Sequence, residues 1–128
     1  MLNCMTVTGT SGRAPFCFPM VDVRDVTQAH LEGILRDEAN GKRFILNCEG
    51  MWVVNIATIL KASGKFPNYP IHEKEDEKDT TGLKPFGRPM TFVNTASRDV
   101  LGIKYIPVEQ SVVDMANSLI ATGYVPAM

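Results

Sequence analysis

The block from Val21 to His30 constrains the fold of this chain more than any other part of its sequence. Val21 and Val23 alternate with polar residues, which favours a short strand. Asp25 is a suitable N-cap and Gln28 follows three residues later, so the block predicts a strand that passes directly into a capped helix. Apolar and small residues, together with one histidine, then recur on one face of that predicted helix: Val26, Ala29, His30, Gly33 and Ile34.

The rest of the chain continues the alternation of strands and helices. Residues 42–47 are predicted as a second strand, and residues 91–93 and 103–106 as further extended segments. Helices are predicted over about residues 51–63 and 95–101, and a last amphipathic helix starts at Pro107 and stops at Gly123. The pattern therefore predicts the α/β class, with about three or four helices and a few short strands.

Composition narrows the class of protein. The chain has 128 residues, of which 45% are hydrophobic, and a net charge of −1, so we expect one globular domain and no affinity for nucleic acid. No apolar stretch approaches the roughly 20 residues that cross a bilayer, and the first residues do not resemble a signal peptide. Three cysteines without a Cys-x-x-Cys pair predict reduced thiols in the cytoplasm and no metal site.

Several blocks resemble one protein family in the same order along the chain. They are Val-Asp-Val-Arg-Asp-Val at 21–26, Gly-Lys-Arg-Phe-Ile-Leu at 41–46, Phe-Pro-Asn-Tyr-Pro at 66–70 and the segment from Leu101 to Met115. These blocks are similar to the C-terminal half of extended short-chain dehydrogenases/reductases, in the branch of the dihydroflavonol, cinnamoyl-CoA and yeast-type methylglyoxal reductases. The resemblance covers about residues 20–126.

The resemblance implies a function. Members of this family are NAD(P)H-dependent oxidoreductases that act on the CH-OH or carbonyl group of small substrates. The resemblance divides the chain into an irregular N-terminal segment, 1–19, and the C-terminal substrate-binding portion of such a reductase, 20–128. In the family a preceding Rossmann domain supplies the cofactor site.

The catalytic pair of the family is a Tyr followed four residues later by a Lys, which lowers the pKa of the Tyr. Tyr69 is followed at that distance by Glu73, and Tyr105 by Glu109. Tyr124 is followed by Met128. We therefore expect no catalytic residue in this chain and no carbonyl reduction by the chain alone.

A glycine-rich stretch near the start has two interpretations. Residues 8–12, Thr-Gly-Thr-Ser-Gly, resemble the first half of the dinucleotide loop of the family. Such a loop needs a following helix to place N–H groups near the phosphates, and Pro15 and Pro19 oppose that helix. The stretch is either a chance loop or the remnant of a real one, and we expect no cofactor to be bound by this chain alone.

Two residues are candidates for the substrate pocket by analogy with the family: Arg24 and Trp52. The structural alternatives are that Asp25 caps the helix, that Arg24 pairs with Asp22 or Asp25, and that Trp52 covers the edge of the core. His30 is predicted to be a packed core histidine rather than a base.

The resemblance also bears on partners. Without a dinucleotide domain, a large apolar face should be exposed, and such faces recruit partners or aggregate. We therefore expect self-association or pairing with a complete reductase. The alternative function is a non-catalytic interaction protein derived from the same family. The charge run at 72–79 is predicted to be a solvated loop.

Overall fold

The computed structural model describes residues 17–71 and 92–128. Its elements are β1 (Cys17–Met20), α1 (Val23–Leu35), the 3-10 helix η2 (Asp37–Ala39), β2 (Glu49–Trp52), α2 (Val53–Ala62), α3 (Thr95–Asp99) and α4 (Val108–Ala121). The described residues thus form four α-helices and two short strands, which confirms the predicted α/β class. The glycine-rich stretch 8–12 and the charge run 72–79 lie outside the described residues.

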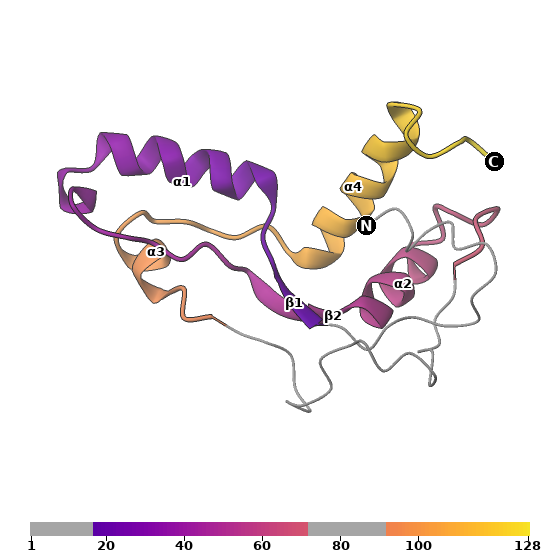
Figure 1. Cartoon of the computed structure of the whole chain (residues 1–128), viewed down its shortest axis with the longest axis horizontal. Coiled ribbons are helices and arrows are strands. Elements are labelled where there is room, and N and C mark those ends of the chain that lie inside the picture. Colours follow the sequence, from indigo (N-terminus) through magenta and orange to yellow (C-terminus); the bar gives the residue numbers. More distant parts are fainter. Residues whose placement is uncertain (1–16, 72–91) are drawn as a thin grey trace.

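The two strands pair antiparallel at the centre of the molecule (Figure 1). Cys17 lies opposite Trp52, and Met20 lies opposite Glu49. The N–H of Cys48 extends the ladder by donating to the carbonyl of Met20 over 2.7 Å. The first strand therefore precedes the Val21–Arg24 segment for which it was predicted, and the chain leaves it to enter α1 after two residues.

Helix α1 begins three residues earlier than the sequence predicts. Asp22 is its N-cap, with φ −73° and ψ 141°, and its carboxylate accepts from the backbone N–H of Arg24. The predicted cap, Asp25, lies inside the first turn and is buried. Both aspartates precede the same apolar spacing, so local preference could not separate them. The guanidinium of Arg24, which also binds Asp22, favours the earlier start.

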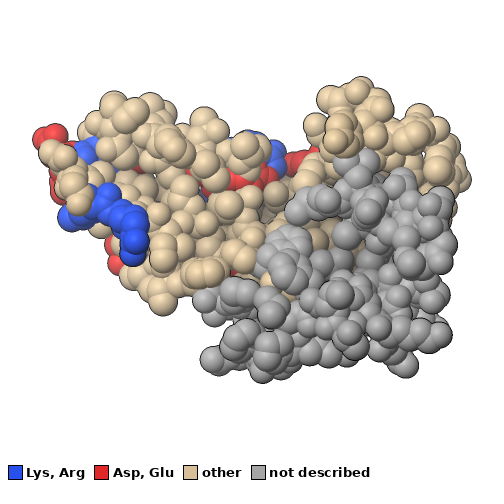
Figure 2. Space-filling model, viewed as in Figure 1, with Lys and Arg blue, Asp and Glu red and all other residues tan. Residues whose placement is uncertain are grey.

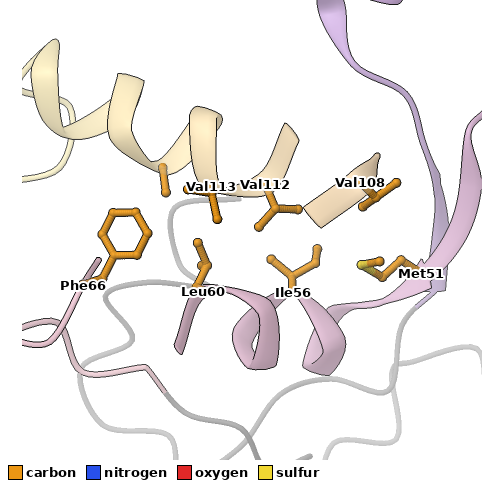
Figure 3. Close-up of a cluster of buried hydrophobic side chains, with 8 residues drawn as sticks. Met51, Ile56, Leu60, Phe66, Val108, Val112 and Val113 are labelled. Atoms are coloured by element: carbon orange, nitrogen blue, oxygen red, sulfur yellow. The ribbon is translucent and has the colours of Figure 1, made fainter. Parts of the chain in front are cut away.

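The larger hydrophobic cluster lies between α2 and α4 (Figure 3). Its buried members are Met51, Ile56, Leu60, Phe66, Val108, Val112, Val113 and Ala116. The last helix is amphipathic as predicted, and Val108, Val112 and Ala116 are buried on its inner face. The helix ends where predicted, because Gly123 adopts φ +72°, a backbone conformation that disfavours side chains with a Cβ.

A second, smaller cluster lies beneath α1. Its buried members are Ala29, Ala39, Leu101 and Ile103, and Phe44 and Leu46 pack against it half-buried. The predicted strand at 42–47 is wrong as secondary structure, because these residues are extended but form no ladder within the described ranges. A strand needs a hydrogen-bonded neighbour, and a sequence pattern cannot supply one.

The exposed side of α1 carries several large apolar side chains among polar ones such as Thr27 and Gln28. Val23 is 75% exposed and Ile34 83% exposed, and Figure 2 shows that side chains without charge cover most of this helix on the face in view. The prediction that His30 is a packed core residue is wrong: His30 is exposed, and its Nδ1 lies 2.8 Å from the carbonyl oxygen of Val26. No helix in the described ranges is long and apolar enough to cross a membrane.

Candidate functional site

A groove of about 320 Å³ lies between the start of α1 and one side of α4. Its polar lining includes Asp22, Arg24, Ser111 and Asp114, and its apolar lining includes Val23, Met115 and Leu119. Acidic and basic side chains gather where the N-terminal end of α1 approaches α4 in Figures 1 and 2. The groove contains Arg24, one of the two residues that the sequence assigns to the substrate pocket.

Asp22 and Arg24 form a two-pronged ion pair. Nε of Arg24 donates to Oδ1 of Asp22 over 2.9 Å, and Nη2 donates to Oδ2 over 2.8 Å. The side chain of Asp22 is only 4% exposed. The Arg24 guanidinium therefore holds the pKa of Asp22 well below its usual range, and a hydroxyl from Ser111 acts in the same direction.

The same guanidinium also connects α1 to α4. Nη2 of Arg24 donates to Oδ2 of Asp114 over 2.8 Å. This second contact is more open to solvent, with side-chain exposures of 50% for Arg24 and 43% for Asp114. The predicted pairing of Arg24 with Asp22 is thus present. Asp114 and Ser111, which lie some 90 residues further along the chain, had no local sequence signal.

Asp25 has a separate task. Its Oδ2 accepts from the backbone N–H of Ile106 over 3.0 Å, and the side chain is buried. This bond fastens α1 to the extended segment that precedes α4. A carboxylate used in this way holds two segments together and does not face the groove lining.

The chemistry that the groove can perform follows from its charges. Two carboxylates and one guanidinium carry a net charge of −1, and Asp22 and Asp114 already engage Nε and Nη2 of Arg24. An anionic substrate group would meet net repulsion here. The arrangement suits a neutral, partly apolar ligand that packs on Val23, Met115 and Leu119.

The second predicted pocket residue lies elsewhere. Trp52 ends β2 and is the N-cap residue of α2. It pairs with Cys17, at the opposite end of the ladder from Met20, which leads to α1. Trp52 is half-buried and does not line the groove. The structure therefore does not bring Arg24 and Trp52 together, and their assignment to a substrate pocket stays a prediction.

The described residues do not fit a dinucleotide pyrophosphate. Helix N-termini attract phosphates when acidic groups are absent. Here α1 begins with the carboxylates of Asp22 and Asp25, and α4 carries Glu109 in its first turn. The start of α2 offers neither glycine nor a cation, because it reads Trp-Val-Val-Asn. We therefore assign no cofactor contact to these residues.

Other reactive groups are scattered. Within the described ranges, no three His, Cys, Asp or Glu residues are placed to hold a metal ion. Burial raises the pKa of the Cys48 thiol, and the negative charge of Glu49 adds to this effect. A thiol with a raised pKa is a poor nucleophile at neutral pH.

Comparisons with known proteins identify relatives of this chain. An uncharacterized oxidoreductase of Saccharomyces cerevisiae is 29% identical over 133 residues, covering 94% of this chain and 34% of the relative. Cinnamoyl-CoA reductase 1 of rice is 32% identical, and cinnamoyl-CoA reductase 2 of Arabidopsis thaliana 33%, each covering 83% of this chain. The chain thus spans about a third of the length of the relatives that it matches. No family model matches the chain.

Solved structures share the fold. Gre2 from Candida albicans is 25% identical with a TM-score of 0.75, and the match covers 95% of this chain and 36% of that protein. Yeast methylglyoxal/isovaleraldehyde reductase Gre2, solved with NADPH, is 21% identical with a TM-score of 0.76, and the match covers 97% of this chain and 39% of that protein. The arrangement of helices and strands described above is therefore one that occurs within larger reductases.

Proposed function

Because the chain belongs to the extended short-chain dehydrogenase/reductase family, we propose that it is the C-terminal, substrate-side portion of an NAD(P)H-dependent reductase of small carbonyl compounds. In this proposal residues 20–128 contribute one wall of the substrate pocket. Residues outside this chain bind the cofactor and carry the catalytic Tyr and Lys.

One observation carries the proposal. Almost the whole chain matches only about a third of each relative, and its three tyrosines lack a Lys four residues later. A chain with the fold of one reductase portion and without the proton donor can shape a pocket but cannot protonate an alkoxide. Bound NAD(P)H would supply the hydride when the rest of the protein is present.

Within that pocket we propose that the main role of Arg24 is to hold α1 in place. Its contacts with Asp22 and Asp114 fix the start of α1 against α4, which sets the width of the groove. The apolar lining of the groove then excludes water and packs against an aliphatic or aromatic substrate. Trp52 does not line this groove, and we propose that it borders the substrate pocket of the complete reductase separately, from β2.

A chimera tests the proposal. The segment of yeast methylglyoxal/isovaleraldehyde reductase that matches this chain is replaced by residues 17–128, and NADPH oxidation is followed with methylglyoxal and isovaleraldehyde. We expect turnover by the chimera and none by the 128-residue chain or by the yeast reductase without the segment. A chimera that folds and binds NADPH but turns over neither substrate would reject the proposal.

The assignment of Trp52 to the pocket is tested in the same chimera. Trp52→Ala should raise KM, because it removes apolar contact area from the bound substrate, while Tyr124→Ala serves as a control on a side chain that is 69% exposed. An unchanged KM in the Trp52 variant would remove Trp52 from the pocket.

The second candidate function is a non-catalytic interaction protein of the same descent. The exposed apolar side chains of α1 favour it: Val23, Leu31, Ile34 and Leu35. Under this alternative the chimera stays inactive while the 128-residue chain binds a protein partner through that face.

A further inference from the structure

After α1 the chain reverses direction and returns toward β2 (Figure 1). The reversal is completed by a β-turn over residues 39–42, in which the N–H of Lys42 donates to the carbonyl of Ala39 over 3.1 Å. Asn40 has φ −59° and ψ 130°, and Gly41 has φ +69°, as in a type II turn. Asn40 and Gly41 therefore occupy the two central positions of this turn.

The surroundings of Asn40 and Gly41 are open. Both residues are exposed, and a Cβ built on Gly41 would meet nothing within 4 Å. No hydrogen bond within the described part of the chain holds the side-chain amide of Asn40 or the N–H of Gly41. Asparagine is one of the chemically labile residues of proteins, and a following glycine has no side chain to hinder the approach of its nitrogen.

We propose that Asn40 is a site of spontaneous deamidation. The nitrogen of Gly41 attacks Cγ of Asn40, and the new N–C bond closes a five-membered imide. The bond from Cγ to Nδ2 breaks, and ammonia leaves with the proton of the Gly41 N–H. Water then opens the imide. Cleavage at the side-chain carbonyl leaves aspartate, whereas cleavage at the backbone carbonyl leaves isoaspartate, in which the main chain runs through the former side chain.

The turn sets the condition for this reaction. With ψ at 130°, the nitrogen of Gly41 is not eclipsed with Cβ of Asn40, as the flat imide ring requires, so the turn has to open first. Among the described residues, one backbone hydrogen bond closes the turn, from Lys42 to Ala39. Exposed segments with few hydrogen bonds open at a low cost in free energy, so the reaction does not require the whole chain to unfold.

Two other asparagines are held more firmly. Asn117 is exposed and precedes Ser118, but both lie inside α4, where the backbone N–H groups are engaged in the helix. Asn68 precedes Tyr69, whose N–H donates to the carbonyl of Phe66 over 3.2 Å. In both cases the attacking nitrogen is engaged and carries a residue with a Cβ. The contrast with these two positions selects Asn40.

Formation of isoaspartate would affect the cluster beneath α1. The turn joins Ala39, which is 6% exposed, to the segment of Phe44, and both side chains pack in that cluster together with Ala29 of α1. Isoaspartate lengthens the main chain between Ala39 and Phe44 by one methylene. Two anchors in one packed cluster cannot both keep their places when the link between them changes, so we expect α1 to loosen.

Peptide mass analysis of the wild-type 128-residue chain, aged at physiological temperature and pH, tests the proposal. The peptide that contains Asn40 should gain one mass unit with time, because a hydroxyl replaces an amide NH2. It should also accept methyl groups from a protein-isoaspartate O-methyltransferase. The peptide that contains Asn117 is the internal control and should react at least about tenfold more slowly, because helical hydrogen bonds must also break there.

Two variants sharpen the test. Asn40→Gln should abolish the gain in mass, since its side chain would have to close a larger ring. Asn40→Asp introduces the charge of the product without the extra methylene, so the amides of α1 should exchange hydrogen faster in the aged wild-type chain than in this variant.

A peptide of unchanged mass, or a gain no faster than that at Asn117, would overturn the site. Equal exchange of α1 in the aged wild-type chain and in Asn40→Asp would overturn the effect on α1. None of these readouts requires reductase activity, so the modification site and the proposed function stand or fall separately.

Discussion

Asp22 and Arg24 are two residues apart in sequence, and their charged groups form two hydrogen bonds, with Nε and Nη2 of Arg24 at 2.9 Å and 2.8 Å from the two carboxylate oxygens. The same carboxylate caps α1 by accepting the N–H of Arg24. One buried side chain therefore starts the helix and orients the arginine that reaches α4.

Replacement of Asp22 by Ala should lower the free energy of unfolding by about 2–4 kcal/mol, because the helix loses its cap and Arg24 loses its buried partner. Asp114→Ala is the matched control, since its carboxylate is 43% exposed and such pairs contribute about 0–1 kcal/mol. Urea denaturation of both variants measures the difference. Equal losses of unfolding free energy in the two variants would show that the burial of Asp22 does not increase its contribution to stability.

Acidification should destabilise the chain through the same carboxylate. The pKa of Asp22 is lowered in the folded chain, mainly by Arg24, so its contribution is present above the unfolded value of about 3.9 and is lost as the pH falls below it. The urea midpoint of the wild-type chain should therefore fall on the acid side of that value. The urea midpoint of Asp22→Asn should fall less steeply with decreasing pH than that of the wild-type chain. Parallel falls of the two midpoints would contradict this prediction.

Leu60→Ala should lower the free energy of unfolding by about 2–5 kcal/mol, because Leu60 is 3% exposed and its loss leaves a cavity between α2 and α4. Thr58→Ala, on the exposed side of the same helix, should change it by less than about 0.5 kcal/mol. Thermal melts of the two variants provide the comparison. A mild effect of Leu60→Ala would mean that the α2–α4 cluster can collapse around the gap.

Two glycines should respond in opposite directions to alanine. Gly102 has φ +69°, and a Cβ there would lie 3.2 Å from Nη2 of Arg36, so Gly102→Ala should destabilise the fold by about 1 kcal/mol. Gly33 lies in α1 with nothing within 4 Å of its would-be Cβ, so Gly33→Ala should stabilise it by about 0.5–1 kcal/mol. The denaturant midpoints of the two variants measure these changes in stability. Changes of the same sign in both variants would contradict the argument.

The Cys48 thiol should alkylate slowly. Burial raises its pKa, so less thiolate is available at mildly alkaline pH than in the unfolded chain. Iodoacetamide labelling followed by peptide mass analysis should show a marked acceleration at Cys48 when urea is added. Equal rates with and without urea would show that the thiol is solvated in the folded chain.

Local chemistry accounts for most of what the sequence predicted correctly. The final helix needed only Pro107 at its start, an apolar face and Gly123 at its end, all of which act within a few residues. Helix α2 was also found, although Met51 and Trp52 belong to β2 and not to its first turn. Patterns with a period near 3.6 residues identify helices without reference to distant parts of a chain.

The failures are non-local. The extended residues 42–47 carry the alternation of a strand, but a ladder depends on a partner that no local pattern reveals. The start of α1 was misplaced because Asp22 and Asp25 compete for the cap, and the helix also depends on Ser111 and Asp114 from α4. The family resemblance was confirmed, whereas the groove was found only once α1 and α4 were placed.

The separation of the two hydrophobic clusters has a consequence for how the molecule opens. Among the residues that the structure describes, the cluster beneath α1 contains four buried apolar side chains, two of them alanines, and the cluster between α2 and α4 contains eight. The free energy of opening is set by the apolar contacts that are broken, so α1 should detach from a body that stays folded. A protease would then cut first around α1, and a ligand in the groove would slow that cut, because the groove exists only while α1 is docked on α4.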